Sequence, residues 1–254
     1  MKIGITECGD AGIDLRWEDS VNKVDGLLLI TKNLNPIFQN KVLKHHKNGV
    51  PIIVHCTCTG WGHTSFEPCV PDYHKQLNWL KSFIDAGFPA ERIVLRIDPI
   101  FPSKAGLDRV MKMLDYYHSL QLPEDKIRYR ISVVDEYPHV KSRYKEHGFE
   151  PLYGTNFYAS KEQMMLVGET LSKTPYTFGT CAEDTLASGF PNTFTVKGCV
   201  SKEDLEIMNI PYDPALFENP QRRNMCHCLS CKFELLNKPR KACPHKCLYC
   251  FWKD

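Results

Sequence analysis

Three cysteines near the end of the chain have the spacing to hold an iron–sulfur cluster. Cys243, Cys247 and Cys250 follow the pattern C-x3-C-x2-C, and Tyr249 directly precedes the third. Three thiolates on one short loop can bind three irons of a cubane [4Fe–4S] cluster and leave the fourth iron without a protein ligand, whereas electron-transfer ferredoxins fill every iron with cysteine. A loop that stops at three cysteines therefore predicts a cluster whose open iron binds another molecule.

The same loop has two other interpretations, a structural zinc site or a set of idle thiols. Zinc is usually held by paired C-x2-C or C-x4-C elements, and a C-x3-C step is unusual for it. A zinc-binding, barrel-like protein would bind nucleic acid or a protein partner without redox chemistry. Basic residues beside the cysteines, Arg222, Arg223 and residues 238–241, would then permit phosphate contacts. The spacing favours the cluster.

The loop resembles the cluster loop of the radical S-adenosylmethionine (radical SAM) enzymes. In that family the open iron chelates the amino and carboxylate groups of SAM, and the aromatic residue lies beside the adenine. The resemblance implies that Cys243, Cys247 and Cys250 bind a [4Fe–4S] cluster and that Tyr249 lies near the adenine. It also implies reductive cleavage of SAM to a 5′-deoxyadenosyl radical, which abstracts hydrogen from a substrate. The sequence leaves that substrate open: a nucleobase or nucleotide, a peptide or a small metabolite. An electron donor such as flavodoxin or ferredoxin would be a partner.

The position of the loop at the end of the chain is similar to that in a bacterial family of unknown function, related in sequence style to spore photoproduct lyase. That family ends in a C-x-C element followed by the C-x3-C-x2-C loop. The stretches of this chain that resemble it are residues 59–62, 96–99, 198–200, 226–228 and 243–250. The resemblance implies a fold and a cofactor, not a substrate.

A second cysteine group precedes the loop. Cys226, Cys228 and Cys231 have the spacing C-x-C-x2-C and could hold an auxiliary Fe–S cluster or a zinc ion. The fourth ligand would come from elsewhere, for which the candidates are Cys56, Cys58 and His227.

The remaining cysteines stand alone in the sequence, and a lone cysteine is most often a small buried hydrophobe. Two of them, Cys181 and Cys199, follow β-like runs and could reach the site. The resemblance to spore photoproduct lyase implies a catalytic role for one of them as a hydrogen-atom donor.

Short β-rich runs alternate with amphipathic helical runs up to about residue 200. The predicted strands cover residues 2–6, 26–32, 51–56, 92–97, 128–134 and 177–181, and the predicted helices 35–48, 72–86, 107–120, 137–147, 161–172 and 201–208. This alternation indicates a parallel sheet. An open doubly wound sheet fits, but we favour a partial (β/α)6 TIM-like barrel, as the resemblance also implies. Residues 1–210 would form the barrel, and residues 211–254 a cysteine-rich Fe–S tail across its mouth.

In such barrels the site lies at the C-terminal ends of the strands. Arg96 ends one strand and must find an anion, which is either Asp98, two residues on, or the SAM carboxylate. Arg130 and Ser132 form a similar inward pair on the next strand. Arg96, Asp98 and Arg130 are therefore candidates for cofactor binding.

Two further strand ends offer candidates for cofactor binding. Gly60 and Gly62 let the backbone approach a ligand closely, and the radical SAM resemblance implies contact with the SAM amino group, although a tight turn is an equal alternative. Glu183 follows the sixth strand and could hold ribose hydroxyls or a substrate amine.

Composition limits the class of protein. The chain has 254 residues, 43% of them hydrophobic, and a formal net charge of only +2, so nothing demands a polyanionic partner. No apolar run is long enough to span a bilayer and no signal-peptide pattern opens the chain, so we expect a cytoplasmic protein with no membrane partner. In a reducing cytosol, twelve cysteines indicate metal ligands rather than disulfides.

Overall fold

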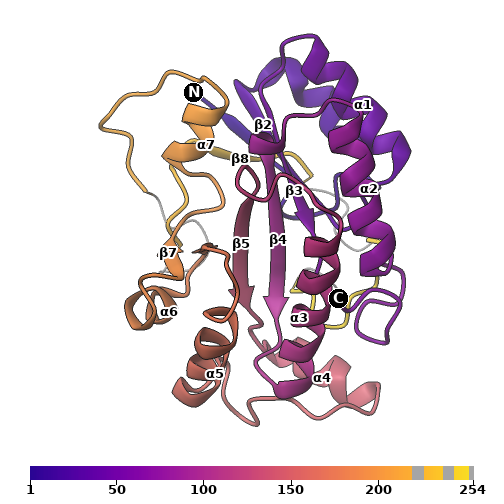
Figure 1. Ribbon diagram of the computed structural model, residues 1–254, viewed down its shortest axis with the longest axis vertical. Coiled ribbons are helices and arrows are strands. Elements are labelled where there is room, and N and C mark those ends of the chain that lie inside the picture. The colour runs from indigo at the N-terminus through magenta and orange to yellow at the C-terminus, as the bar shows by residue number, and fades with distance from the viewer. Residues whose placement is uncertain (219–225, 237–242, 252–254) are drawn as a thin grey trace.

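The strands of the protein form one parallel sheet. The computed structural model describes residues 1–218, 226–236 and 243–251, and its eight strands lie in the order β7-β6-β5-β4-β3-β2-β1-β8 (Figure 1). The strands are β1 (Ile3–Ile5), β2 (Gly26–Thr31), β3 (Ile52–Thr57), β4 (Ile93–Ile100), β5 (Arg128–Val133), β6 (Phe178–Thr180), β7 (Phe194–Val196) and β8 (Lys232–Glu234). Every neighbouring pair is parallel. The predicted α/β class is confirmed.

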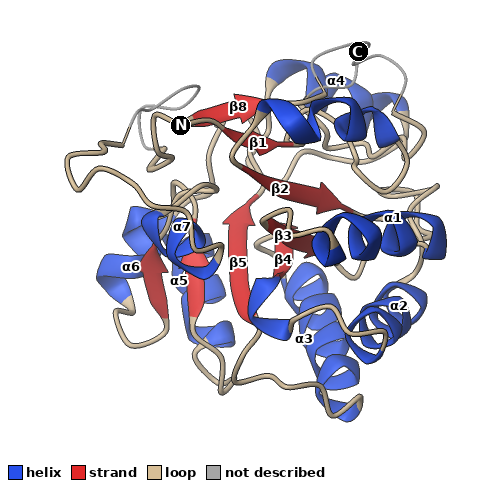
Figure 2. Ribbon diagram, turned by 90° about the horizontal axis from the view of Figure 1, so that it is seen from above, coloured by secondary structure: helices blue, strands red, loops and turns tan. Residues whose placement is uncertain are grey.

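Helices connect the strands and cover the sheet. They are α1 (Pro36–Lys47), α2 (Tyr73–Asp85), α3 (Lys104–Ser119), α4 (Pro138–Glu146), α5 (Lys161–Leu171), α6 (Asp184–Gly189), α7 (Lys202–Ile207) and the 3-10 helices η1 (Leu15–Lys23) and η2 (Ala90–Arg92). Polar N-cap residues determine where several helices begin. The Asn35 side chain accepts backbone hydrogen bonds at the start of α1, and Ser160 with Gln163 forms a capping box at the start of α5. Figure 2 shows α1, α2 and α3 along one outer side of the curved sheet.

The sheet is buried on both faces, which explains why its strands appear in the sequence as unbroken apolar runs. In β2, Leu27 and Leu29 belong to the main core, whereas Leu28 belongs to a second core on the opposite face. Successive side chains of a strand point to opposite faces, so a strand covered on both sides needs apolar residues at consecutive positions. Each fully buried leucine contributes roughly 1.5–3 kcal/mol.

The sheet has two more strands than the six that the sequence predicted, and both are edge strands. β7 and β8 have three residues each, too few for an alternating pattern to stand out from a loop. The last strand that the sequence predicted covers residues 177–181, whereas β8 lies in the predicted tail and pairs in parallel with β1. Part of the predicted tail thus belongs to the sheet.

The two edges of the sheet meet through loops, and no β7–β8 pairing occurs among the described residues. The Leu229 N–H donates to the Val200 carbonyl at 3.0 Å. A Cβ added to Gly198 would lie 2.2 Å from the carbonyl oxygen of His227. The segment after β7 and the segment before β8 therefore pack backbone against backbone.

Gly198→Ala is expected to loosen this contact. The added methyl group would overlap the His227 backbone, and relieving the overlap costs about 1–3 kcal/mol of the free energy of unfolding. Gly189→Ala is the matched control, because nothing lies within 4 Å of a Cβ added there. Urea denaturation compares the two variants, and equal stability would contradict the close packing of the two segments.

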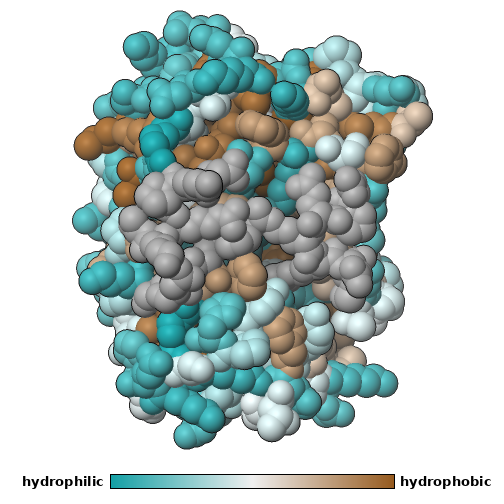
Figure 3. Space-filling model, turned by 180° about the vertical axis from the view of Figure 1, so that it is seen from behind, coloured by the Kyte–Doolittle hydropathy of each residue, from teal (hydrophilic) through white to brown (hydrophobic). Residues whose placement is uncertain are grey.

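The surface opposite to the view of Figure 1 mixes polar and apolar side chains, with apolar ones gathered in its upper part (Figure 3). Among the helices of the described residues, none combines the length and the apolar character needed to cross a bilayer. The basic residues of the zinc interpretation, Arg222, Arg223 and residues 238–241, lie outside the described part of the chain.

Candidate functional site

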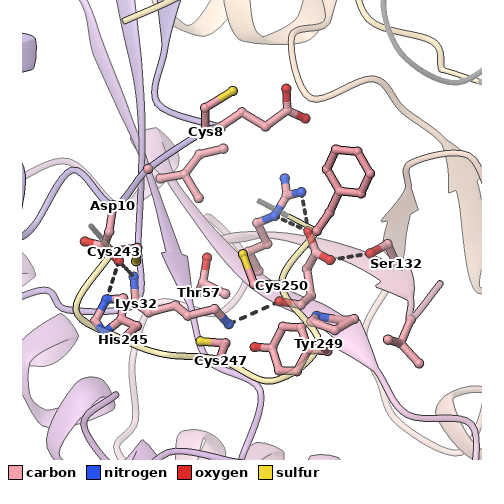
Figure 4. A pocket seen from close by; sticks show the side chains of 18 of the residues that line it. Cys8, Asp10, Lys32, Thr57, Ser132, Cys243, His245, Cys247, Tyr249 and Cys250 are labelled. Carbon is pink, nitrogen blue, oxygen red and sulfur yellow. Dashed lines mark hydrogen bonds and ion pairs between the residues drawn. The ribbon is translucent and has the colours of Figure 1, made fainter. Parts of the chain in front are cut away.

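Residues 243–251, here called the cysteine loop, cover a cavity at the C-terminal ends of β1 to β5. The cavity has a volume of about 680 Å³ and is lined by all three cysteines of the loop and by Tyr249 (Figure 4). Polar side chains at or just past the strand ends also line it, among them Cys8, Lys32, Thr57, Asp98 and Ser132. This edge is where parallel α/β sheets carry their functional residues.

The thiols of the cysteine loop differ in exposure. Cys243 is exposed, Cys250 is half-buried and Cys247 is buried. Burial raises the pKa of Cys247 well above the usual thiol range. In the described ranges, no three His, Cys, Asp or Glu side chains already converge as metal ligands. Binding of a metal here would require loss of the thiol protons and movement of the thiols toward one another.

Arg143 of α4 holds the cysteine loop by its backbone. Its Nε donates to the Leu248 carbonyl at 3.0 Å, and its Nη2 donates to the Cys250 carbonyl. From the other side, the Leu248 N–H donates to the Phe66 carbonyl at 3.0 Å. Because these hydrogen bonds use main-chain groups of the loop, they fix its path without involving its thiols.

Asp10 ties the cysteine loop to the segments after β1 and β2. Its Oδ2 accepts hydrogen bonds from His245 Nε2 at 2.8 Å and from the Lys32 N–H at 2.7 Å. Its Oδ1 accepts from Thr31 Oγ1 at 2.7 Å and from the Gly12 N–H at 2.8 Å. Burial would raise the pKa of Asp10, but the hydrogen bond and charge of His245 outweigh it and the pKa is lowered. Burial would lower the pKa of His245, and Asp10 raises it. Each partner stabilises the charged form of the other.

Asp10→Asn is expected to lower the free energy of unfolding by about 1–3 kcal/mol. An amide offers one acceptor oxygen and one donor nitrogen, so buried donors that now face Asp10 lose their acceptor. Asp14→Asn is the control, since Asp14 is a helix cap and asparagine caps as well as aspartate. Urea denaturation of both variants tests the expectation, and equal midpoints would contradict it.

A buried charged network fixes Tyr249 at the wall of the cavity. Glu67 is 1% exposed, and its Oε1 accepts hydrogen bonds from Lys32 Nζ at 2.9 Å and from the Tyr249 hydroxyl. Its Oε2 accepts from Thr59 Oγ1 at 2.8 Å. Burial would lower the pKa of Lys32, but the charge of Glu67 outweighs it and the pKa is raised. Lys32 Nζ also lies 5.5 Å from the centre of the Tyr249 ring.

Arg96 pairs with Asp98, one of the two anions that the sequence left open for it. Arg96 Nε donates to Asp98 Oδ2 at 2.6 Å, and the Ser132 hydroxyl donates to Oδ1. Burial would raise the pKa of Asp98, but Arg96 outweighs it and the pKa is lowered. Arg96 Nη1 also lies 3.5 Å from Cys199 Sγ. Arg96 thus connects the cavity with a second group of cysteines.

Comparison with known families identifies most of the chain. Residues 15–252 match the family described as a domain of unknown function, DUF1848. The chain belongs to this family. No curated protein matches the DUF1848 chain. The matched residues include the cysteine loop and β2 to β8, whereas Cys8 and Asp10 precede them.

The two glycines predicted to contact SAM lie outside the cavity lining of the DUF1848 protein. Gly60 has a φ of +79°, and a Cβ there would lie 3.0 Å from the Arg109 carbonyl oxygen. A Cβ on Gly62 would lie 2.0 Å from the Pro71 carbonyl oxygen. In the structure both glycines serve close backbone packing around Trp61, whose ring lies 4.4 Å from the Arg109 guanidinium.

Arg130 and Glu183 also lie outside the lining. The predicted inward pair of Arg130 and Ser132 does not form, because the Ser132 hydroxyl donates to Asp98 instead. Arg130 is buried, and its Nε and Nη1 have no hydrogen-bond partner among the described residues. Glu183 accepts a hydrogen bond from the Val133 N–H at 2.9 Å, at the wall of a neighbouring cavity.

The structure brings two further cysteines to the second cysteine group. Cys199 Sγ lies 3.6 Å from Cys181 Sγ, and together with it the thiols of Cys226 and Cys228 lie close enough to Cys181 to raise its pKa. Cys231 lies in the same core as Cys199 and Cys228, and its carbonyl accepts from the Ile3 N–H at 2.9 Å. Among the described residues, no hydrogen bond joins its thiol to the other thiols of the group.

Sequence reasoning missed three residues that organise the site: Asp10, Glu67 and His245. Asp10 lies just past the first strand, the kind of position at which candidates were sought, and His245 lies within the cysteine loop itself. Glu67 lies in an irregular loop before α2, where no pattern distinguishes it from a surface carboxylate.

Proposed function

We propose that the protein is a radical SAM enzyme that binds a [4Fe–4S] cluster through Cys243, Cys247 and Cys250. One observation carries the proposal. These cysteines lie far in sequence from the first five strands, yet all three line one cavity with the ends of those strands. A structural zinc loop would have no need of such a cavity.

We also propose that the sheet is an incomplete barrel. The strands follow one another in sequential order from β1 to β7, and the two edges approach each other through their loops. A closing sheet brings all strand ends to one mouth, where the cysteine loop would cover them.

The residues present fit the cofactor and SAM. A volume of about 680 Å³ is within the usual range of ligand sites, roughly 300–1,000 Å³. Three thiols supply three ligands for a cluster with one open iron. Thr57 Oγ1 is buried at this wall without a hydrogen-bond partner in the described residues, so it is available to a polar group of SAM. Tyr249, held by Glu67, would lie against the adenine.

SAM cleavage at the reduced cluster would supply the chemistry, namely methionine and a 5′-deoxyadenosyl radical that abstracts hydrogen from the substrate. The protein's own residues bind, orient and exclude water. Arg143 and Asp10 fix the loop from two sides, and the Lys32 ammonium places a positive charge near Cys247. The exposed Cys243 marks the side from which flavodoxin or ferredoxin would deliver the electron.

A second cavity would receive the substrate. It has a volume of about 1,020 Å³ and shares Val133, Val134, Asp135 and Tyr137 with the first. Aromatic side chains, including Phe157, line its wall. A substrate with a flat apolar part would pack there, with its reacting hydrogen directed toward the shared wall.

The test is anaerobic incubation of the purified protein with SAM and dithionite. Release of 5′-deoxyadenosine, with about four irons and four sulfides per chain, is the expected result. A colourless, iron-free protein that leaves SAM intact would overturn the proposal.

A further inference from the structure

Four thiols from three separate segments meet beside the cavity but outside its lining. Cys199 and Cys181 have their sulfur atoms 3.6 Å apart. The Cys199 N–H donates to Cys228 Sγ at 3.2 Å. Together with the Cys199 thiol, those of Cys226 and Cys228 lie close enough to Cys181 to raise its pKa. The four cysteines are therefore neighbours in the fold.

The four cysteines lie beside β6 and the two edge strands, β7 and β8. Cys181 directly follows β6, Cys199 lies just past β7, and Cys226 with Cys228 precedes β8. β7 and β8 are the outermost strands. A ligand that joined all four sulfurs would fasten the two edges together.

Two of the predicted candidates for the fourth ligand lie in a different core. Cys56 and Cys58 belong to the main core, whereas Cys199 and Cys228 belong to the second core. The third predicted candidate, His227, points both ring nitrogens at carboxylates, those of Glu218 and Asp184.

We propose that Cys181, Cys199, Cys226 and Cys228 bind one zinc ion that clasps the two edges of the sheet. With Zn–S bonds of about 2.3 Å, sulfurs of a tetrahedral site lie about 3.8 Å apart, close to the 3.6 Å that separates Cys181 from Cys199. The cysteine sulfurs around a cubane cluster are much farther apart, because each binds a different iron. The contact between these two sulfurs therefore favours a single ion over a cluster. Binding would also have to draw the other two thiols in, because no three such side chains of the described residues are already placed as metal ligands.

The surroundings fit a tetrathiolate. On binding zinc the four thiols release four protons, so the complex carries a charge of −2. Arg96 Nη1 lies 3.5 Å from Cys199 Sγ and Lys232 Nζ 3.8 Å from Cys228 Sγ, which places two cations beside it. The Cys199 N–H donates to Cys228 Sγ at 3.2 Å, the kind of outer contact that orients metal ligands.

The test measures zinc in protein purified without added metal. We expect one zinc per chain in the wild type and in the variant in which Cys243, Cys247 and Cys250 are all alanine. Loss of outer-shell partners alone costs about 10–100-fold in metal affinity, so Cys226→Ser combined with Cys228→Ser should reduce bound zinc at least about tenfold. Cys231→Ser is the matched control and should keep its zinc.

X-ray absorption at the zinc edge of the wild-type protein keeps the test independent of any folding defect in the variants. Four sulfur neighbours at about 2.3 Å are expected. The proposal would be overturned if the protein contained no zinc, if the zinc had nitrogen or oxygen ligands, or if iron occupied this site. It would also be overturned if Cys231→Ser lost the zinc and the double variant kept it. SAM cleavage is scored separately, so failure of the clasp and failure of the radical SAM function are distinguishable.

Discussion

Cys247→Ala is expected to abolish both the brown iron–sulfur colour and the cleavage of SAM. Cys247 is the middle cysteine of the loop and is buried at the cavity wall. Its loss leaves two thiols, and since removal of outer-shell partners alone costs about 10–100-fold, 5′-deoxyadenosine formation should fall by more than about 100-fold. Anaerobic absorption spectra and chromatography of 5′-deoxyadenosine measure the two effects.

Cys69→Ala is the matched control. Cys69 is an exposed thiol beside the loop, and its N–H donates to the His245 carbonyl at 3.4 Å, a contact that alanine keeps. The variant should keep colour and activity. SAM cleavage that survives in Cys247→Ala would show that the loop does not hold the cluster.

Cys8→Ala asks whether the fourth iron is open. Cys8 lines the same cavity as the loop and is the cysteine outside it that could cap the cluster. If the iron is open to SAM, the variant keeps its four irons and its activity. Loss of the cluster in this variant would mean that a fourth thiolate closes it.

The fold was predictable from the sequence where a strand is buried on both faces, because such a strand needs a long run of apolar residues. β2 and β3 have six residues each and read as strands directly. β8, Lys232–Glu234, has one apolar residue between two charged ones and becomes a strand only because β1 offers a free edge. Tertiary pairing of this kind has no local pattern.

Parts of the candidate site were predictable where the residues concerned lie close together in the sequence at a recognisable spacing. The cysteine loop and the Arg96–Asp98 pair belong to this class. The proximity of Cys181 and Cys199 to Cys226 and Cys228 joins segments far apart in the chain, so spacing alone does not reveal it. The partner of a buried charge is likewise set by the fold, as the Asp10–His245 pair shows across 235 positions.

The buried pair of Lys32 and Glu67 affects both the stability of the protein and the position of Tyr249 in the site. Glu67 accepts from both the Lys32 ammonium and the Tyr249 hydroxyl. A buried ion left without its partner costs about 3–5 kcal/mol, whereas removing both charges of such a pair is often neutral. Removing one charge of this pair should therefore destabilise the protein, whereas folding does not require that both charges be present.

Glu67→Gln and Lys32→Met are each expected to lower the free energy of unfolding by about 3–5 kcal/mol, because each leaves the other charge buried and unpaired. The double variant should lose less than the sum, since its glutamine still offers an oxygen to the Tyr249 hydroxyl and no lone charge remains. Asp85→Asn, which breaks the exposed pair with Lys81, is the control and should change stability by less than about 1 kcal/mol. Anaerobic urea denaturation of the four variants and the wild type gives the coupling energy. Strict additivity would show that the two charges do not depend on each other and that Tyr249 is held by other contacts.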